Sequence, residues 1–304
     1  MPRLRRSADG ARRLGGFTSP EARRRYLAAY DAAMALMPIP DEIRDLPTAY
    51  GTVRVYYYAP TTREARAHAP LVLLPGTRSG APVFADNLAG LRECAPVYVL
   101  DLLGEPGRSV QTAPIASAAD QSAWLHEVLR TLPERRFHLC GLSIGGWTAV
   151  NCALASEESI ASLVLVEPVN VFAGLSWQVY LRSIPASVRW FPKAWREAFS
   201  SWSAGVVPVE DEPVGRMIEA GMQAYDVRQP AIARIPARRL GGITVPVLVL
   251  VAGDSPIHRA EAVARTARAE LQHGTVRVYP GASHAINGEF PERIAEDVRA
   301  FLPE

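Results

Sequence analysis

One serine of this sequence stands in a setting that could make it a nucleophile. Ser143 is the central residue of positions 141–145, which read G-L-S-I-G and so have the form G-x-S-x-G. The apolar run Phe137–Cys140 precedes this motif, and helix-forming residues follow it. A tight turn from strand to helix strains the serine backbone and exposes the hydroxyl at the carboxyl end of a sheet. We therefore predict Ser143 as a nucleophile, with a helix N-terminus behind it that favours negative charge.

A serine hydroxyl becomes a strong nucleophile only when a neighbouring base takes its proton. His284 comes shortly after the apolar run Val276–Tyr279, the last such run of the chain. A strand there would end at the same sheet edge as the strand before Ser143, so we predict His284 as the base. His138 and His258 lie at positions where we expect a structural role.

Attack on a carbonyl also needs N–H groups aimed at the negative charge that develops on its oxygen. Gly76 follows the apolar run Leu71–Leu74 and lets the chain turn at the predicted sheet edge. We predict that the main-chain N–H groups of Thr77 and Ile144 donate to this oxyanion, and that Gly76 lies against the substrate.

These residues must be positioned by a sheet whose strands are covered on both faces. Thr52–Tyr58 alternates as a half-buried strand does, whereas the other apolar runs are uninterrupted, which is typical of parallel strands. These runs are 71–74, 97–100, 137–140, 163–166, 247–251 and 276–279. Helical stretches between them supply the crossovers, at about 84–93, 118–132, 146–156, 258–271 and 291–302. A further helix begins at Ser19 as N-cap and ends before Pro38.

The strand spacing is interrupted once, by about 80 residues between Val166 and Val247, far more than a plain crossover needs. This insert is rich in aromatic residues and predicts a helical cap over residues 169–235. Most of these side chains are expected to form the core of the cap. We predict that Trp177 and Tyr180 line a pocket for an apolar or aromatic acyl group.

Composition and charge exclude several classes of function. The 304 residues carry 33 basic and 31 acidic side chains, a balance that gives no reason to expect a nucleic acid or an anionic membrane as partner. Residues 1–18, with clustered arginines, predict a disordered tail. Three cysteines without metal-type spacing predict reduced thiols and a cytoplasmic protein. Nothing calls for a metal or an organic cofactor, and the sequence does not indicate the oligomeric state.

From about residue 50 to the end, the order of elements and motifs resembles the α/β-hydrolase superfamily, in particular capped, esterase-like members from actinobacteria. Residues 101–109 resemble the D-x-x-G-x-G-x-S turn of that family, and residues 281–284 resemble its G-x-x-H loop. Where the family usually has His-Gly, this chain has Pro75-Gly76. The resemblance implies a mostly parallel open sheet flanked by helices, formed by residues 19–168 and 236–304, with the cap inserted between these two segments.

The resemblance leaves two candidates for the acid that orients the base. The family usually places it after the strand 247–251 in a G-x-x-D-P pattern, and this chain reads Gly253-Asp254-Ser255-Pro256 there. Asp254 is thus one or two residues out of register. Some superfamily members instead place the acid after the preceding strand, where this chain has Glu167. The sequence favours neither Asp254 nor Glu167.

Three functions are compatible with these residues. The first is hydrolysis of a carboxylic ester, lactone or thioester through an acyl-enzyme on Ser143. The second is another reaction on the same scaffold, either carbon–carbon bond hydrolysis or a cyclase or acyltransferase step of a biosynthetic pathway. The third is a non-catalytic binding protein. A serine in the G-x-S-x-G motif argues against the dehalogenase and epoxide-hydrolase branches, which use aspartate at that position.

Overall fold

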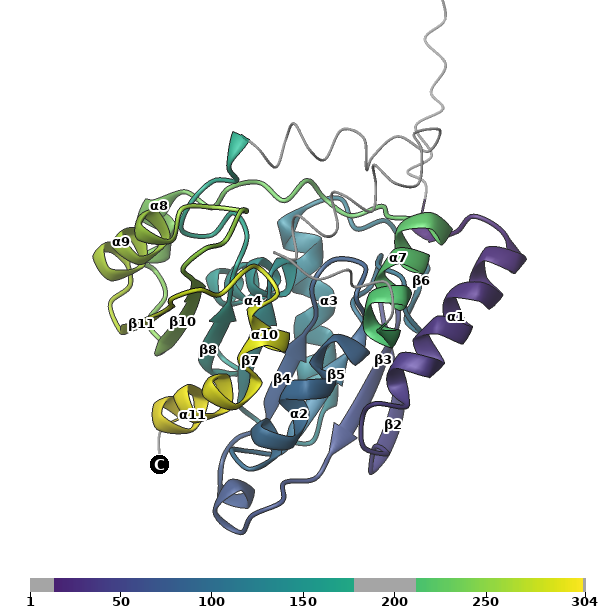
Figure 1. Cartoon of the computed structure of the whole chain (residues 1–304), viewed down its shortest axis with the longest axis horizontal. Coiled ribbons are helices and arrows are strands. Elements are labelled where there is room, and N and C mark those ends of the chain that lie inside the picture. Colours follow the sequence, from purple (N-terminus) through teal and green to yellow (C-terminus); the bar gives the residue numbers. More distant parts are fainter. Residues whose placement is uncertain (1–13, 178–211, 303–304) are drawn as a thin grey trace, which may run out of the picture.

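The main sheet places the carboxyl ends of six parallel strands along one edge. The computed structural model describes residues 14–177 and 212–302, and within them nine strands form this sheet (Figure 1). The parallel strands run in the order β11-β10-β8-β7-β4-β5. Their bounds are β4 Leu71–Leu74, β5 Val97–Leu100, β7 Phe137–Leu142, β8 Ile160–Val166, β10 Val247–Ala252 and β11 Gly274–Tyr279. This confirms the expected sheet and the α/β fold.

An antiparallel margin extends the sheet beyond β5. There β3 (Gly51–Tyr58) pairs with β5, and β2 (Glu42–Thr48) and the short β6 (Val110–Gln111) pair with β3. We did not predict β2 from the sequence. It contains Pro47 and buries only Leu46, so it lacks the apolar pattern of a strand and depends on pairing with β3.

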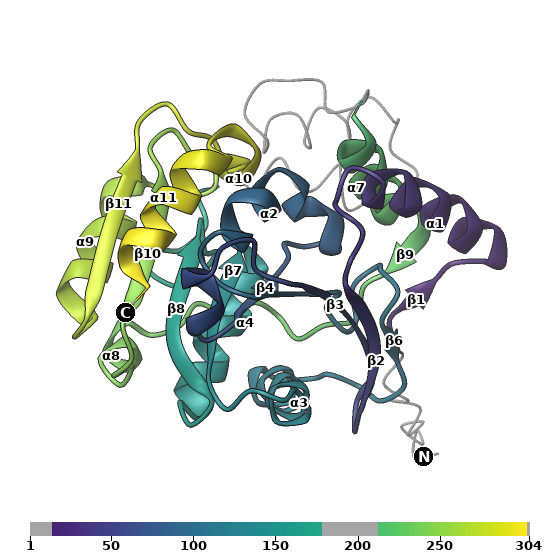
Figure 2. The same cartoon turned by 90° about the horizontal axis from the view of Figure 1, so that it is seen from below.

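Alternate residues of the inner strands face two separate hydrophobic layers. In β4, Val72 and Leu74 pack into one core, whereas Leu71 and Leu73 pack into the other. Buried residues of α3 (Ala118–Thr131), α4 (Ile144–Ala155), α8 (Ala237–Leu240) and α9 (Ala260–Glu270) belong to the first core. Those of α1 (Pro20–Met34), α2 (Ala85–Arg92), α7 (Pro213–Ala224), α10 (Ile286–Glu289) and α11 (Pro291–Phe301) belong to the second. Figure 2 shows α3 and α2 on opposite sides of the sheet.

The helix expected after Ser19 is confirmed as α1, and the Ser19 side chain accepts a hydrogen bond from the N–H of Ala22. Tyr26 and Tyr30 on its inner face are fully buried, and each hydroxyl bonds to the turn after β5. The predicted disordered tail extends too far, because Phe17 lies in the short strand β1 (Gly16–Phe17). This strand pairs with β9 (Tyr225–Asp226), and the Phe17 ring packs on Tyr26.

The structure describes the predicted cap only in part. The predicted cap, residues 169–235, includes α7 and β9, but residues 178–211 lie outside the described residues. In both views α7 lies beside α1 (Figures 1 and 2).

Among the described helices, none has the length and apolar character that crossing a bilayer requires.

Candidate active site

The turn between β7 and α4 forces Ser143 into a strained backbone conformation. Its φ of 54° and ψ of −112° lie where a non-glycine residue is rarely found. The N–H of Ser143 donates to the carbonyl of Val166 on β8 at 3.0 Å, which fixes the turn to the sheet. A Cβ atom at Gly145 would collide with the carbonyl oxygen of Leu74, and one at Gly141 would collide with the backbone of Gly145. The glycines of the motif are therefore required by close backbone approach.

Three segments far apart in the sequence bring a hydroxyl, an imidazole and a carboxylate together. The Nε2 atom of His284, in the loop after β11, lies 3.1 Å from Oγ of Ser143. Its Nδ1 atom lies 3.0 Å from Oε2 of Glu167, the residue directly after β8. The structure thus confirms the predicted proximity of Ser143 and His284. Because the carboxylate can only accept, Nδ1 carries the proton and the lone pair of Nε2 faces the serine hydroxyl.

Glu167 is fully buried and held by four hydrogen bonds. Oε1 accepts from the N–H of Ala252 at 2.9 Å and from Nε2 of His258 at 3.0 Å. Oε2 accepts from the hydroxyl of Ser255 at 2.8 Å, besides the bond from His284. Burial by itself would raise the pKa of Glu167, but the hydrogen bonds from the two imidazoles outweigh it and keep this pKa well below its usual range. The carboxylate is therefore ionised at neutral pH.

The other acid candidate lies elsewhere. The side chain of Asp254 is exposed and makes no hydrogen bond to a described residue, while its main-chain N–H donates to the carbonyl of Ala282. The pairing of Asp254 with His284 that we considered from the sequence is therefore not found. The physical reason is that the end of β10 and the loop after it surround the carboxylate of Glu167, through Ala252, Ser255 and His258, and that the loop turns Asp254 toward solvent.

Sequence reasoning missed the contact between His258 and the acid. This buried imidazole shares Glu167 with His284, and its Nδ1 atom has no hydrogen-bond partner among the described residues. The one signal that could have pointed to it is its position in the loop after β10, the same loop that suggested Asp254. Ser255 carries the same signal.

The predicted oxyanion donors belong to residues next to Gly76 and Ser143 in the sequence. Gly76 follows β4 so closely beside the nucleophile that a Cβ atom there would be 3.6 Å from the Cβ atom of Ser143. The main-chain N–H groups of Thr77 and Ile144 donate to none of the described residues. Within the part of the chain that the structure describes, both groups therefore lack a partner, and their role as oxyanion donors remains a prediction.

The predicted substrate contacts are only partly described. Gly76 lies at the site, and the Trp177 side chain, in the first part of the predicted cap, is 67% exposed. Tyr180 lies outside the described residues. The roles of Trp177 and Tyr180 remain predictions.

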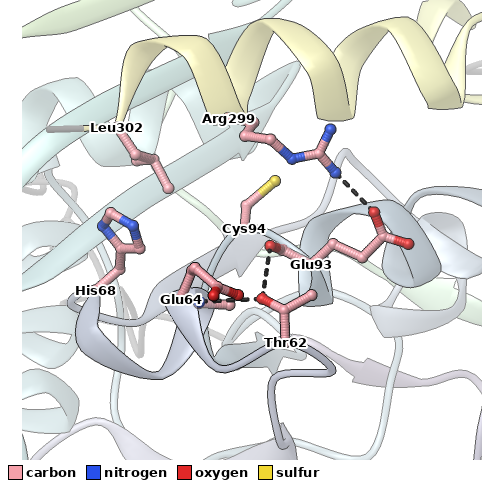
Figure 3. A pocket seen from close by; sticks show the side chains of 8 residues that line it. Thr62, Glu64, His68, Glu93, Cys94, Arg299 and Leu302 are labelled. Atoms are coloured by element: carbon pink, nitrogen blue, oxygen red, sulfur yellow. Dashed lines mark hydrogen bonds and ion pairs between the residues drawn. The ribbon is translucent and has the colours of Figure 1, made fainter. Parts of the chain in front are cut away.

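A recess of about 260 Å³ lies away from this site (Figure 3). Its lining includes residues that precede β4 and β5, so it is at the amino edge of the parallel strands, opposite Ser143. Burial raises the pKa of the Cys94 thiol in its wall, and Arg299 there pairs with Glu93 at 2.7 Å. A protonated thiol is a poor nucleophile, so the raised pKa argues against Cys94 as a reactive group.

Comparisons with known proteins show which proteins this chain is similar to. A model of the alpha/beta hydrolase family matches residues 71–297. Carboxylesterase YbfK of Bacillus subtilis is 24% identical over 293 residues, which cover 94% of this chain and 96% of that protein. The crystal structure of naproxen esterase from the same organism is 22% identical, with a TM-score of 0.83, and covers 92% of this chain and 98% of that chain. The (E)-2-((N-methylformamido)methylene)succinate hydrolase of Acinetobacter baylyi is 23% identical, covering 77% of this chain and 90% of that protein.

Proposed function

The chain belongs to the alpha/beta-hydrolase family and is a hydrolase, and on that premise we propose that it cleaves carboxylic esters through an acyl-enzyme on Ser143. The observation that carries the proposal is the hydrogen-bonded series from Ser143 through His284 to Glu167, at 3.1 and 3.0 Å. These distances are within the range in which a base can take the proton of a nucleophile. The similarity to two carboxylesterases supports the same assignment.

In this proposal His284 acts as the base. Nε2 takes the proton of the serine hydroxyl as Oγ attacks the carbonyl carbon of the ester, and a tetrahedral oxyanion forms. The N–H groups of Thr77 and Ile144 donate to that oxyanion. The imidazolium then gives its proton to the departing alkoxide, so that the alcohol leaves and an ester on Ser143 remains. Water, deprotonated by His284, attacks this ester and releases the carboxylic acid and the serine.

Glu167 supports both steps as the acid of a Ser-His-Glu triad. Its hydrogen bond to Nδ1 fixes the tautomer whose Nε2 is free, and its negative charge stabilises the imidazolium that forms. Because the pKa of Glu167 lies well below its usual range, the carboxylate stays ionised while His284 gains and loses a proton. Asp254 has no part in the proposal.

Substrate choice is assigned to residues 169–235, which we propose form a cap with an aromatic surface suited to an apolar acyl group. Lactones and thioesters present the same carbonyl to the nucleophile and are included as substrates. The three cysteines are buried free thiols, which suits the reducing cytoplasm as the place of the reaction.

A fluorophosphonate probe and p-nitrophenyl esters of increasing acyl length test the proposal. We expect the wild type to be labelled and to hydrolyse the esters, and the Ser143→Ala variant to do neither. A wild type that neither reacts with the probe nor hydrolyses any ester would point to a binding protein instead. Labelling without ester hydrolysis would favour carbon–carbon bond hydrolysis or a cyclase or acyltransferase step. Vinylogous diketones and carrier-bound thioesters are the substrates that test these reactions.

A further inference from the structure

Glu105 is a second buried carboxylate near the site, and the proposed mechanism does not use it. It lies in the turn that follows β5, and only 3% of its surface is exposed. A buried carboxylate is costly unless its oxygens find donors. The residues that supply those donors show what Glu105 does.

Both oxygens of Glu105 hold the loop that follows β4. Oε1 accepts from the hydroxyl of Thr77 at 3.1 Å, and Oε2 accepts from the main-chain N–H of Arg78 at 2.9 Å. The loop is strained, because Arg78 has a φ of 57°. The hydroxyl of Ser79 closes the turn by donating to the carbonyl of Gly76 at 2.8 Å. The two bonds to Glu105 thus tie a strained loop to the turn that follows β5.

The same loop flanks the nucleophile. Gly76 lies beside the side chain of Ser143, and the N–H of Thr77, the next residue, is the proposed oxyanion donor. Such donors work only when they lie about 2.7–3.1 Å from the oxyanion, so a loop shift of less than 1 Å weakens them. Glu105 bonds to Thr77 itself and to the residue after it, and therefore restrains the peptide that carries this donor.

We propose that Glu105 is a positioning residue that holds the loop 76–78 in the geometry in which the N–H of Thr77 meets the oxyanion. The inference rests on the proposed function and concerns the same site. Glu105 acts through the loop and does not touch the substrate.

The surroundings of Glu105 make this restraint sensitive to pH. Burial raises the pKa of Glu105 to about 7, and hydrogen bonds and charge from Arg78, together with the hydroxyl of Thr77, oppose that rise. Of the other titratable groups in residues 14–177 and 212–302, Tyr26 of α1 and Tyr225 of β9 interact with it, and the pKa of each is raised, first by burial. An ionised carboxylate accepts hydrogen bonds more strongly than a protonated one. The hydrogen bonds from Thr77 and Arg78 to Glu105 therefore become stronger as pH rises through about 7.

Glu105→Gln keeps the size of the side chain but removes the charge and one acceptor. We expect kcat for a p-nitrophenyl ester to fall about tenfold, with KM little changed. This loss of kcat is smaller than the roughly 10²–10³-fold loss that follows removal of a whole oxyanion donor. A trifluoromethyl ketone, which forms a tetrahedral oxyanion on Ser143, should bind about tenfold more weakly, whereas the carboxylic acid product binds as before. An ionisation near pH 7 should disappear from the pH profile of kcat.

Two further variants complete the experiment. Thr77→Val, at an exposed position, removes one of the two bonds to Glu105 and should reduce kcat by a smaller factor. Glu134→Gln is the matched control, because Glu134 accepts from Tyr98 at 3.2 Å at the amino edge of the sheet. This control should leave kcat and ketone binding unchanged.

Unchanged kcat and ketone affinity in both Glu105→Gln and Thr77→Val, with only a lower Tm, would mean that Glu105 is merely structural and would overturn the inference. If Glu105→Gln does not fold, Thr77→Val alone decides. The wild type is tested with the fluorophosphonate and with esters before any variant is compared. If it is neither labelled nor active, the proposed function itself is refuted.

Discussion

Two buried carboxylates, Glu167 and Glu105, bond to residues near Ser143, and they differ in the donors that surround them. Glu167, at the carboxyl end of β8, receives four hydrogen bonds, two of them from imidazoles, and its pKa is held well below the usual range. Glu105, after β5, receives bonds from a hydroxyl and an amide, and burial raises its pKa to about 7. Both are almost fully buried. Burial alone therefore does not decide ionisation, and the number and kind of donors do.

The difference corresponds to the two tasks proposed for these groups. A carboxylate that stabilises an imidazolium must keep its charge throughout the reaction, and four donors ensure that. A carboxylate that only restrains a loop can fulfil its role with two bonds. The predictions below test this comparison, from the largest expected effect to the smallest.

Removing the charge of Glu167 should have the largest effect. We expect Glu167→Gln to lower kcat on a p-nitrophenyl ester by about 10³–10⁴-fold, because an amide neither fixes the tautomer of His284 nor stabilises its cation. Asp254→Asn is the matched control and should leave kcat within about twofold, since Asp254 is exposed. The reverse pattern would show that the acid is Asp254.

Removing a donor from Glu167 should have an intermediate effect. We expect His258→Leu to lower kcat about tenfold and stability by about 1–3 kcal/mol, because Oε1 of Glu167 loses a buried hydrogen bond. His258→Gln offers an amide donor and should restore part of the lost kcat. Steady-state kinetics and urea unfolding measure the two effects, and a His258→Leu enzyme with unchanged kcat would exclude a role for this contact in catalysis.

Glu105 should make the stability of the protein depend on pH in a defined window. Its pKa rises from the ordinary 4.5 to about 7 in the folded state, so the folded protein binds the proton more tightly than the unfolded chain. This contribution to stability is fully present below pH 4.5 and is lost as pH rises through about 7. As pH rises from 4.5 to about 7, the Tm of the wild type should therefore fall relative to that of Glu105→Gln. Above about pH 7 the difference between the two Tm values should level off. A Tm difference that does not change with pH would contradict the raised pKa.

The smallest effect is expected from Ser255→Ala. Glu167 then loses a neutral donor but keeps three others, so kcat should fall only about two- to fivefold. Stopped-flow measurement of acylation would resolve so small a change. A loss as large as that of Glu167→Gln would mean that the hydroxyl of Ser255, and not the imidazoles, maintains the charge of Glu167.

The sequence by itself determined the parts that depend on local pattern. Uninterrupted apolar runs predicted the parallel strands, because a strand buried on both faces has no polar alternation. The G-x-S-x-G motif located Ser143 on its turn, and the position of His284 after the last strand placed it at the same sheet edge. By contrast, β2 has no apolar pattern of its own, and the pairing of β1 with β9 joins residues about 200 positions apart.

Only the tertiary structure decided which carboxylate meets His284. Glu167 and Asp254 each follow a strand that ends at the correct edge, so pattern and spacing treat them alike. What separates them is the path of the loop after β10, which directs His258 and Ser255 onto Glu167 and leaves Asp254 in solvent. The hydrogen bonds of Glu105 to Thr77 and Arg78 were likewise decided only by the tertiary structure. Contacts between residues so distant in the chain depend on side-chain packing in three dimensions, which a linear pattern does not encode.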